Sequence, residues 1–432
     1  MPCPPKTSYG YGSSWMICWA RKTVVMPAKA VIFDYKTLLL KPGNAAAAET
    51  AALLHSLAAR GLQWCILSTD PLSPAQKERI QQLGYPAPSL LVDRSHIAGG
   101  KNRGSPAWID AVTTALHLQR YELLYVGCTA LDWRTAINSG VMYQHAAWAA
   151  PMPGGTTSLV AHAPGDVDRF LEMFLSGDPS WSHRTDQDNW SLRSLLPASA
   201  RLPSTSPGTT FRLQDVFTYK RPVEIGDADA RSVLMLFVLA YAYLEDLIPA
   251  SPYFCIYPSS TSGQVSERLK TYLDKAAALF HGYYREDLLV RAVDAPDTSL
   301  ERWKASQGQA AKDVSIATQA QTVHLGPGYR GKLGAKTVVV VDDFTTHGMS
   351  LEWARLLLTA AGTRRIVMLT VGKYGSRHTR YDLKDPSTLA PYRINTLTAD
   401  SFTTTSLTPV FDPQAEGRLY QRLAAALDSS QD

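Results

Sequence analysis

Short apolar runs alternate with helical patterns along the first third of the chain, and this order predicts a fold class. The runs at 30–34, 62–68 and 122–127 are typical of buried strands, because they offer no polar face to water. Two further short strands are predicted at 89–92 and near Val141. The helical patterns between the strands span 45–60, 74–83, 105–118 and 131–139. Strands that alternate with helices predict a parallel sheet covered on both faces.

The second half of the chain repeats this alternation, so the sequence predicts an α/β fold with two doubly wound parallel-sheet domains. Strands are predicted at 253–257, 288–293, 338–341 and 363–371, and helices at 227–246, 265–280, from 350 onward and at 413–427. The predicted domain organisation is an irregular arm at 1–27, a first domain at 28–176, a linker at 177–210 and a second domain at 211–432. The linker is predicted because that stretch is polar and rich in Ser, Pro, Asp and Arg.

Composition restricts the class of protein. A chain of 432 residues with 45% apolar and 19% charged residues is typical of a soluble globular protein with two or three domains. The net charge of +5 is too mild over this length to indicate nucleic acid as a partner. The five cysteines are scattered and lack C-x-x-C spacing, which favours a reducing, cytoplasmic location without disulfides or structural zinc. The longest apolar run, 233–244, is shorter than the ~20 residues of a membrane helix.

The stretch 337–350 carries the most specific chemistry. Four consecutive valines end in Asp342 and Asp343, at the carboxyl end of a predicted strand, where open α/β sheets place their ligands. A turn at 345–348 then leads into a helix that begins with Ser350, a good capping residue. Free amides at a helix N-terminus suit a dianionic phosphate, and the carboxylates can accept hydrogen bonds from a vicinal diol. Together these groups would hold a ribose 5-phosphate by both ends.

This stretch resembles the motif with which type I phosphoribosyltransferases bind 5-phosphoribosyl 1-diphosphate (PRPP). The shared pattern is a hydrophobic strand, two acids, two variable residues, Thr, a small residue, Gly, any residue and Ser or Thr. The resemblance implies that Asp342 and Asp343 act in catalysis by holding the ribose hydroxyls and Mg²⁺. It also implies a phosphate-binding turn made of Thr345, Thr346, His347, Gly348, Met349 and Ser350. His347 departs from the pattern, since the family has a small residue there.

The stretch 337–350 also fits other patterns. A strand that ends in Asp-Asp is also a Walker B pattern, and residues 326–332 have the G-x-x-x-x-G-K spacing of a P-loop. Leu333 stands where a Mg²⁺-binding Ser or Thr belongs, and no helix fits before the next strand, which argues against a P-loop. Two alternatives stay open: an ordinary turn whose aspartates cap a helix, and a phosphoribosyltransferase-like fold that binds a nucleotide without catalysis.

The same resemblance implies further contacts with the diphosphate. Ser259, Ser260 and Thr261 follow a predicted strand at the place where the family's loop binds pyrophosphate through backbone amides. A plain Ser-rich turn is the alternative. Lys373 and Tyr374 follow another predicted strand, and could face the base or the diphosphate.

A polar stretch at 294–321 corresponds to the mobile loop that closes over PRPP in these enzymes. It carries Arg302, Lys304 and Lys312, whose charges would meet the developing charge of pyrophosphate. The alternative for each of these residues is a solvated position on a charged loop.

The first domain resembles the haloacid-dehalogenase (HAD) hydrolase superfamily along most of its length. Residues 31–38 resemble the first motif of that superfamily, and residues 127–132 resemble its Gly-Asp-x-x-x-Asp magnesium motif. The matching residues are Asp34 for the nucleophile, Ser68 or Thr69 for the phosphate-binding hydroxyl, Lys101 for the charge-balancing lysine and Asp132 for a magnesium-binding carboxylate.

Two departures change what this resemblance implies. Lys36 replaces the aspartate that serves as acid and base, and Cys128 replaces the first carboxylate of the magnesium motif. A thiol is a poor ligand for Mg²⁺, which demands hard oxygen ligands. The sequence therefore predicts a degenerate HAD-like domain, used for scaffolding or ligand sensing, with a vestigial site at Asp34, Lys36, Ser68, Lys101 and Asp132. Lys101 could instead be an exposed loop lysine.

The predicted function is that of a phosphoribosyltransferase, which binds PRPP with Mg²⁺ as cofactor and transfers ribose 5-phosphate to a nucleobase-like acceptor. One alternative is a non-catalytic sensor of PRPP or a nucleotide. The other is a HAD-type phosphohydrolase with an accessory sugar-phosphate-binding domain. The expected partners are PRPP or a nucleotide and a small-molecule acceptor, without membrane or nucleic acid. A homo-oligomer is left open, and the sequence does not identify the acceptor.

Overall fold

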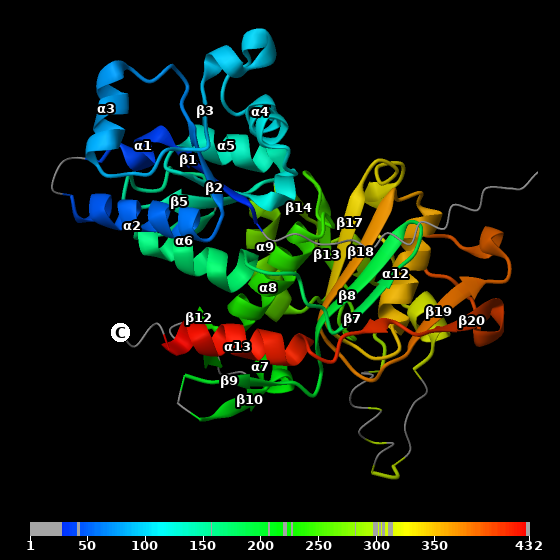
Figure 1. Ribbon diagram of the computed structural model, residues 1–432. Coiled ribbons are helices and arrows are strands. Elements are labelled where there is room, and N and C mark those ends of the chain that lie inside the picture. Colours follow the sequence, from blue (N-terminus) through cyan, green and yellow to red (C-terminus); the bar gives the residue numbers. More distant parts are fainter. Residues whose placement is uncertain are drawn as a thin grey trace, which may run out of the picture.

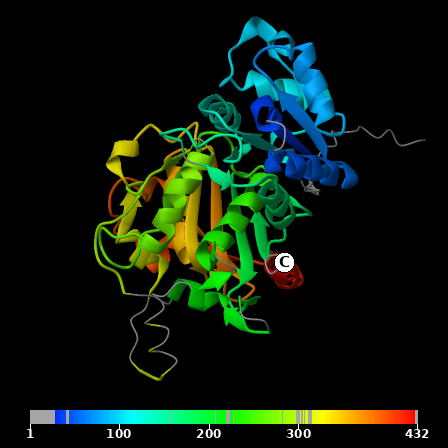
Figure 2. The same ribbon diagram turned by 90° about the vertical axis from the view of Figure 1, so that its left-hand side faces the viewer.

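The computed structural model describes residues 28–428 except 41–43, 157, 206–207, 219–222, 226–227, 281, 297–300, 302–303, 305–306 and 310–313. Two α/β units lie side by side in it, each built around its own sheet (Figure 1). Figure 2 shows the first unit, in blue and cyan, standing above the second. The arm predicted at 1–27 lies outside the described residues. None of the described helices has the length and apolar character needed to cross a membrane.

The first sheet has six strands, and every neighbouring pair in it is parallel, as predicted. Its order is β3 (Leu90–Val92), β2 (Gln63–Leu67), β1 (Ala30–Asp34), β4 (Leu123–Gly127), β5 (Met142–Ala146) and β6 (Leu159–Ala161). The helices of this unit are α1 (Tyr35–Leu38), α2 (Ala45–Ala59), α3 (Pro74–Gln82), α4 (Ala107–Leu116), α5 (Ala130–Ser139) and α6 (Pro164–Phe170).

Helices cover both faces of this sheet, because successive residues of its strands point to opposite sides. Val31 and Phe33 of β1 pack with residues of α2 and α6, whereas Ala30 and Ile32 pack with residues of α4 and α5. All five residues of β1 are buried, and Asp34 ends the strand at the carboxyl edge of the sheet. The predicted doubly wound arrangement is therefore present in the first unit.

The second sheet has seven strands and is mixed. Its order is β14 (Tyr283–Tyr284), β13 (Tyr253–Ile256), β17 (Thr337–Thr345), β18 (Arg365–Lys373), β8 (Trp190–Pro197), β7 (His183–Asp186) and β21 (Val410–Phe411). The first five run parallel, while β7 and β21 pair antiparallel at one edge. The helices of this unit are α7 (Leu213–Thr218), α8 (Ala230–Leu244), α9 (Glu267–Leu279), α11 (Ile316–Ala320), α12 (Met349–Ala360) and α13 (Ala415–Asp428). The all-parallel sheet predicted for this half is thus found in five of its seven strands, from β14 to β8.

The valine run lies at the centre of this sheet, between β13 and β18. Val339 and Val341 face the cluster that includes α8 and α9, whereas Val338 and Val340 face the cluster of α11 and α12. All four are at most 1% exposed, which explains why the run lacks polar alternation. The strand predicted at 288–293 forms the two-stranded ribbon β15 (Leu289–Arg291) with β16 (Val323–Leu325) and not a strand of the main sheet.

Three further ribbons complete the described strands. They pair β9 (Arg201–Pro203) with β10 (Thr210–Arg212), β11 (Glu224–Ile225) with β12 (Ala228–Asp229), and β19 (His378–Leu383) with β20 (Phe402–Leu407). Two of these strands, β9 and β10, include residues of the stretch predicted as a linker.

The stretch 177–210 is structured, which corrects the linker prediction. It holds β7 and β8, and β8 lies beside β18 inside the second sheet. The polar side chains of β8 are buried with partners distant in the sequence. Arg193 Nε lies 2.7 Å from Glu245 Oε2, and Ser194 Oγ lies 2.6 Å from Thr370 Oγ1. Polar composition indicated a linker because these partners are not visible in the local sequence.

One hydrophobic cluster spans both units. It contains Val31 and Phe33 of the first sheet together with Val339 and Val341 of the second. Helix α8 lies between the sheets (Figure 1), and the Phe237 ring in it packs 4.6 Å from the ring of Phe174. The two units therefore share a core.

Candidate functional site

The predicted carboxylate pair lies at the carboxyl end of β17. Asp342 and Asp343 are half-buried. The Asp343 amide donates to Asp342 Oδ1 at 3.0 Å, and the Phe344 amide donates to Asp343 Oδ1 at 2.7 Å. Burial and the neighbouring Asp343 carboxyl raise the pKa of Asp342 well above its usual range. Burial also raises the pKa of Asp343. The hydrogen bond from the Phe344 amide and the positive charge of Arg268 in α9 oppose that rise.

A tight turn connects this pair to the N-terminus of α12. Gly348 has a φ of 85°, a left-handed conformation that favours glycine, and α12 begins at Met349, one residue before the predicted start. A Cβ on Gly348 would lie 2.1 Å from Cε1 of His378, so the turn also needs glycine for space. The His347 side chain is exposed and its carbonyl accepts a bond from the Thr379 amide at 2.9 Å. The large side chain at 347 is thus accommodated on the outer side of the turn.

Two buried groups fix this turn and the first helical residues. Lys373, at the end of β18, donates from its ammonium to the Thr346 carbonyl, and at 2.8 Å to the Arg377 carbonyl. Burial lowers the pKa of Lys373 to about 8. Glu352, in the first turn of α12, binds His378 Nε2 at 2.8 Å. Lys373 therefore stabilises the turn through its bonds to two backbone carbonyls. Its position in the sequence had instead indicated a contact with the base or the diphosphate.

The Ser-rich loop after β13 lies at the same edge of the sheet. Strand β13 pairs in parallel with β17, with Ile256 opposite Val341, so the segments after both strands emerge side by side. Ser259 and Ser260 are half-buried and Thr261 is exposed. The loop is held internally, since the Ser259 amide donates to the Gln264 carbonyl at 3.0 Å.

Arg291 stabilises this loop through a hydrogen bond to its backbone. The Arg291 guanidinium is 4% exposed and donates to the Ser259 carbonyl. It also donates to Gln319 Oε1 at 3.1 Å. In the predicted mobile loop, Arg302 and Lys312 lie outside the described residues. Lys304 forms an ion pair with Glu301 at 2.7 Å.

A second group of charged residues lies at the carboxyl edge of the first sheet. Asp34 follows β1, and Asp132 lies on α5 after β4. The guanidinium of Arg103 joins the two carboxylates, with Nη1 at 2.6 Å from Asp34 Oδ2 and Nη2 bound to Asp132 Oδ1. Arg103 Nη2 also binds the Tyr125 hydroxyl. All four side chains are buried, so this is a closed network of opposite charges.

The cation that balances these carboxylates is Arg103, which corrects the prediction of Lys101. Lys101 is exposed, and its backbone carbonyl accepts a bond from Trp108 Nε1 at 3.1 Å. The segment 99–104 contains both cations two residues apart, and the sequence pattern alone does not show which one points inward. Tyr125, the fourth member of the network, is an interior strand residue with no sequence signal beyond its position in β4.

The other predicted residues lie near the network but differ in exposure. Lys36 is exposed, and its amide donates to Asp34 Oδ1 at 2.9 Å. Ser68 is 3% exposed, and its hydroxyl donates to the Asp70 carbonyl at 2.6 Å. The Ser68 hydroxyl therefore bonds within its own loop.

Asp34, Cys128 and Asp132 lie close enough together to offer three atoms to one metal ion, within 4.8 Å of one another. Their chemistry does not fit Mg²⁺. Both carboxylates already bind Arg103, and burial, together with the two aspartates, raises the pKa of the Cys128 thiol to about 12. A protonated thiol is a poor ligand for a hard cation. Burial and Asp132 also raise the pKa of Asp34 to about 6, and Arg103 opposes that rise.

Solved structures similar to this chain include several HAD-type proteins. One is the core domain of a protein from Streptococcus pneumoniae provisionally described as a phosphoglycolate phosphatase, with 19% identity over 34% of this chain and 98% of that one, at a TM-score of 0.26. Another is a HAD-superfamily hydrolase of subfamily IA from Geobacter sulfurreducens, with 15% identity over 32% and 97% of the two chains and a TM-score of 0.25.

A third is the deoxy-D-mannose-octulosonate 8-phosphate phosphatase of Haemophilus influenzae in its cobalt-bound form. It has 18% identity over 34% of this chain and 87% of that one, and a TM-score of 0.26. No family model matches the chain, and no curated protein matches it. At these TM-scores the structural likeness does not assign the chain to a family.

Proposed function

We propose that the edge formed by β17, α12 and the loop after β13 binds PRPP and transfers its ribose 5-phosphate to a nucleobase-like acceptor. The observation that carries the proposal is the order of groups along 342–349. Two half-buried carboxylates are followed by a left-handed glycine turn that opens directly onto a helix N-terminus. A ribose 5-phosphate presents a diol and a dianion at its two ends, and this order matches both.

Each group has a chemical task in this proposal. Asp342 and Asp343 accept hydrogen bonds from the ribose hydroxyls and stabilise positive charge on the ring. The amides of the turn and of the first turn of α12 hold the 5-phosphate. The bond from C1 to the pyrophosphate oxygen breaks as the acceptor nitrogen forms its bond from the opposite face, and the acceptor loses a proton. Pyrophosphate leaves toward the loop at 259–261. Positioning of the two reactants supplies most of the rate increase.

The carboxylate pair at β17 fits Mg²⁺ better than the network in the first unit does. Both groups are oxygen donors. Burial raises both pKa values, and the Asp343 charge adds to the rise at Asp342; a bound cation would oppose both effects. Asp342 and Asp343 would hold the ion, whose chemistry when bound is to neutralise charge on the pyrophosphate. In the first unit, the Arg103 guanidinium already occupies the carboxylates.

We propose that the HAD-like first unit supports the fold without hydrolysing phosphate esters. Three features support this proposal: the Arg103 bridge on Asp34, the lysine at 36 and the protonated thiol of Cys128. An active phosphohydrolase would need Asp34 free to attack phosphorus, with a metal beside it.

Calorimetric titration of PRPP with Mg²⁺ into the full chain tests the proposed site. Wild type should bind, and the Asp342→Asn/Asp343→Asn double variant should lose binding, because it keeps the shape of the turn but removes the charges. Asp34→Asn is the matched control, since it neutralises a buried aspartate in the other unit. Pyrophosphate release in the presence of a panel of nucleobases would then identify the acceptor.

Four outcomes would redirect the interpretation. Binding of PRPP without release of pyrophosphate with any base would favour a sensor. Binding of a nucleotide but not PRPP would favour a nucleotide-binding module. Unchanged PRPP binding in the double variant would rule out this edge as the site. Hydrolysis of a generic phosphomonoester, lost in Asp34→Ala, would support the phosphohydrolase alternative instead.

A further inference from the structure

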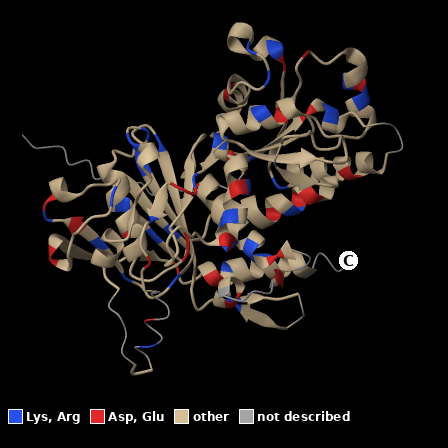
Figure 3. Ribbon diagram, turned by 180° about the vertical axis from the view of Figure 1, so that it is seen from behind, with Lys and Arg blue, Asp and Glu red and all other residues tan. Residues whose placement is uncertain are grey.

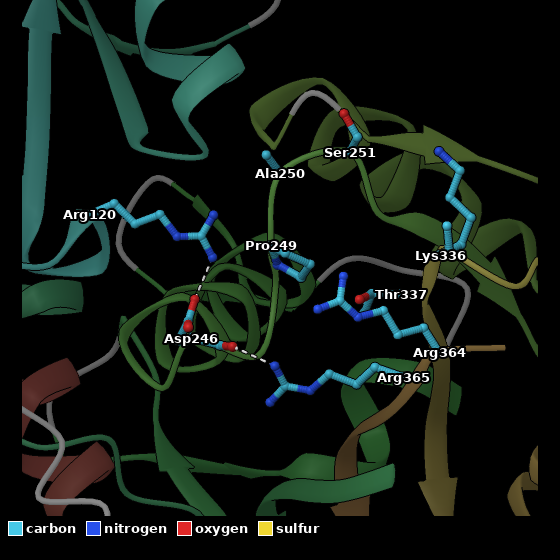
Figure 4. A pocket seen from close by; sticks show the side chains of 10 residues that line it. Arg120, Asp246, Pro249, Ala250, Ser251, Lys336, Thr337, Arg364 and Arg365 are labelled. Carbon is cyan, nitrogen blue, oxygen red and sulfur yellow. Dashed lines mark hydrogen bonds and ion pairs between the residues drawn. The ribbon is translucent and has the colours of Figure 1, made fainter. Parts of the chain in front are cut away.

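A cavity of about 430 Å³ lies where the first unit meets the second (Figure 4). Arg120 of the first unit forms one wall, and the segment 246–251 after α8 forms another. The remaining lining comes from the first residues of β17 and β18. These are the amino ends of the strands, whereas Asp342 lies in the carboxyl half of β17, five residues after Thr337 and roughly 17 Å away at ~3.3 Å per residue. The cavity is therefore separate from the PRPP site proposed above.

The lining of this cavity is strongly basic. It includes Arg120, Lys336, Arg364 and Arg365, against the single acid Asp246. Seen from behind in Figure 3, positive and negative residues are otherwise interspersed over both units. Four cations around one small space repel one another, and a bound anion would relieve that repulsion.

Asp246 neutralises only one of the four cations around the cavity. Its carboxylate forms the ion pair with Arg120, and its backbone carbonyl accepts a bond from Arg365 Nη1 at 3.0 Å (Figure 4). Burial lowers the pKa of Arg365, and the Asp246 carboxylate opposes that effect. The backbone of Asp246 has a φ of 52°, an uncommon conformation for a non-glycine residue.

Within the described residues, two of the cations lack the kind of contact with Asp246 that engages Arg120 and Arg365. Within the part of the chain that the structure describes, neither Arg364 nor Lys336 forms an ion pair. Arg364 is exposed and its guanidinium points toward the middle of the cavity (Figure 4). Lys336 is half-buried, with its ammonium 5.0 Å from the centre of the Tyr253 ring. These two side chains can turn to a ligand without breaking an existing salt bridge.

We propose that this cavity binds the diphosphate group of a small molecule, either inorganic pyrophosphate or a nucleoside di- or triphosphate. Its volume lies within the range of small-molecule sites. Arginine binds phosphate oxygens through two parallel hydrogen bonds, and three of the four cations are arginines. Because Arg120 belongs to the first unit and the other cations to the second, the bound diphosphate joins the two units.

Calorimetric titration of the full chain with pyrophosphate, ATP, AMP and inorganic phosphate tests this inference. Pyrophosphate and ATP should bind, and AMP and phosphate should bind more weakly, because they carry fewer charges. The Lys336→Ala/Arg364→Ala variant should weaken pyrophosphate binding by about tenfold or more, since two charge-assisted hydrogen bonds are lost. The matched control is Lys77→Ala/Lys275→Ala, which removes two exposed lysines elsewhere and should bind as wild type.

The experiment separates this site from the proposed PRPP site. Pyrophosphate binding that persists in Asp342→Asn/Asp343→Asn and falls in Lys336→Ala/Arg364→Ala supports the basic cavity, whatever the fate of PRPP. Tighter binding of ATP than of pyrophosphate identifies a nucleotide as the ligand, and the reverse identifies free pyrophosphate. Equal binding by wild type and the Lys336→Ala/Arg364→Ala variant overturns the inference. It is also overturned if none of the four probes binds.

Discussion

At the residue scale, the Arg103 side chain decides the character of the first unit. Its guanidinium lies between Asp34 and Asp132, and all three side chains are at most 3% exposed. Removing one partner of a buried ion pair leaves an uncompensated charge, which costs far more than breaking a surface pair. Here two carboxylates would be left facing each other.

Arg103→Met should therefore lower the free energy of unfolding by about 3–5 kcal/mol, the usual range for a broken buried pair. Urea unfolding followed by tryptophan fluorescence would measure it. Lys101→Met is the matched control, and it should change stability by less than about 0.5 kcal/mol because Lys101 is exposed. Equal effects of the two substitutions would contradict the assignment of Arg103 as the balancing cation.

The titration of Asp34 gives a pH dependence with a definite sign. Burial, with Asp132 adding to it, raises the pKa of Asp34 from 3.8 to about 6, so the folded state holds this proton more tightly than the unfolded state. The resulting stabilisation is fully present below pH ~4 and is lost as pH rises through about 6, by an amount on the order of 3 kcal/mol.

Asp34→Asn should remove this decline. The free energy of unfolding of wild type minus that of Asp34→Asn should therefore decrease between pH 4 and pH 7, measured by urea titration at each pH. The subtraction cancels the carboxylates that lie outside the Arg103 network, which both proteins share, and leaves the coupled titration of Asp34 and Asp132. A difference that is flat, or that increases with pH, would mean that Asp34 is ionised throughout this range.

The residues of this network show what the sequence could and could not indicate. Asp34 ends β1 and Asp132 comes shortly after β4, and the hydrophobic runs of both strands are evident in the sequence. The approach of the two aspartates at one edge of the sheet was therefore predictable. The choice between Lys101 and Arg103 depends on the direction of side chains in an irregular segment, which no periodic pattern encodes.

At the element scale, the turn between β17 and α12 depends on one glycine. Gly348 has a positive φ, and a Cβ there would collide with the ring of His378, which is itself held by Glu352. Gly348→Ala should therefore destabilise the protein by about 2–4 kcal/mol through the left-handed backbone and the collision together. It should also abolish PRPP binding, because the amides of the turn would move. Thermal unfolding and calorimetry would measure the two effects.

Gly375→Ala is the matched control for this prediction. Gly375 also has a positive φ, of 63°, but a Cβ there would have no atom within 4 Å. Its substitution should cost only about 1 kcal/mol, the backbone cost alone. If both substitutions had the same effect, the contact with His378 would have no part in shaping the turn.

The elements were predictable where hydrophobic periodicity is strong. The strand with four valines and the helix that follows it begin within one residue of their predicted starts, although the strand continues four residues further than predicted. Strand β8 was not, because Ser191, Arg193 and Ser194 are buried in it by partners far away in the chain. A strand whose polar residues find tertiary partners has the local composition of a loop.

At the scale of the whole molecule, the two units should unfold together, because one hydrophobic cluster runs through both. Phe237 lies at the centre of the contact, 0% exposed and packed against Phe174 and Tyr241. Phe237→Ala should cost about 3–5 kcal/mol by leaving a cavity. Scanning calorimetry should show a single transition, moved to a lower temperature as a whole. Phe411→Ala, at a ring 49% exposed, is the control and should move it little. Two transitions, of which Phe237→Ala moves only one, would show that each sheet folds with a core of its own.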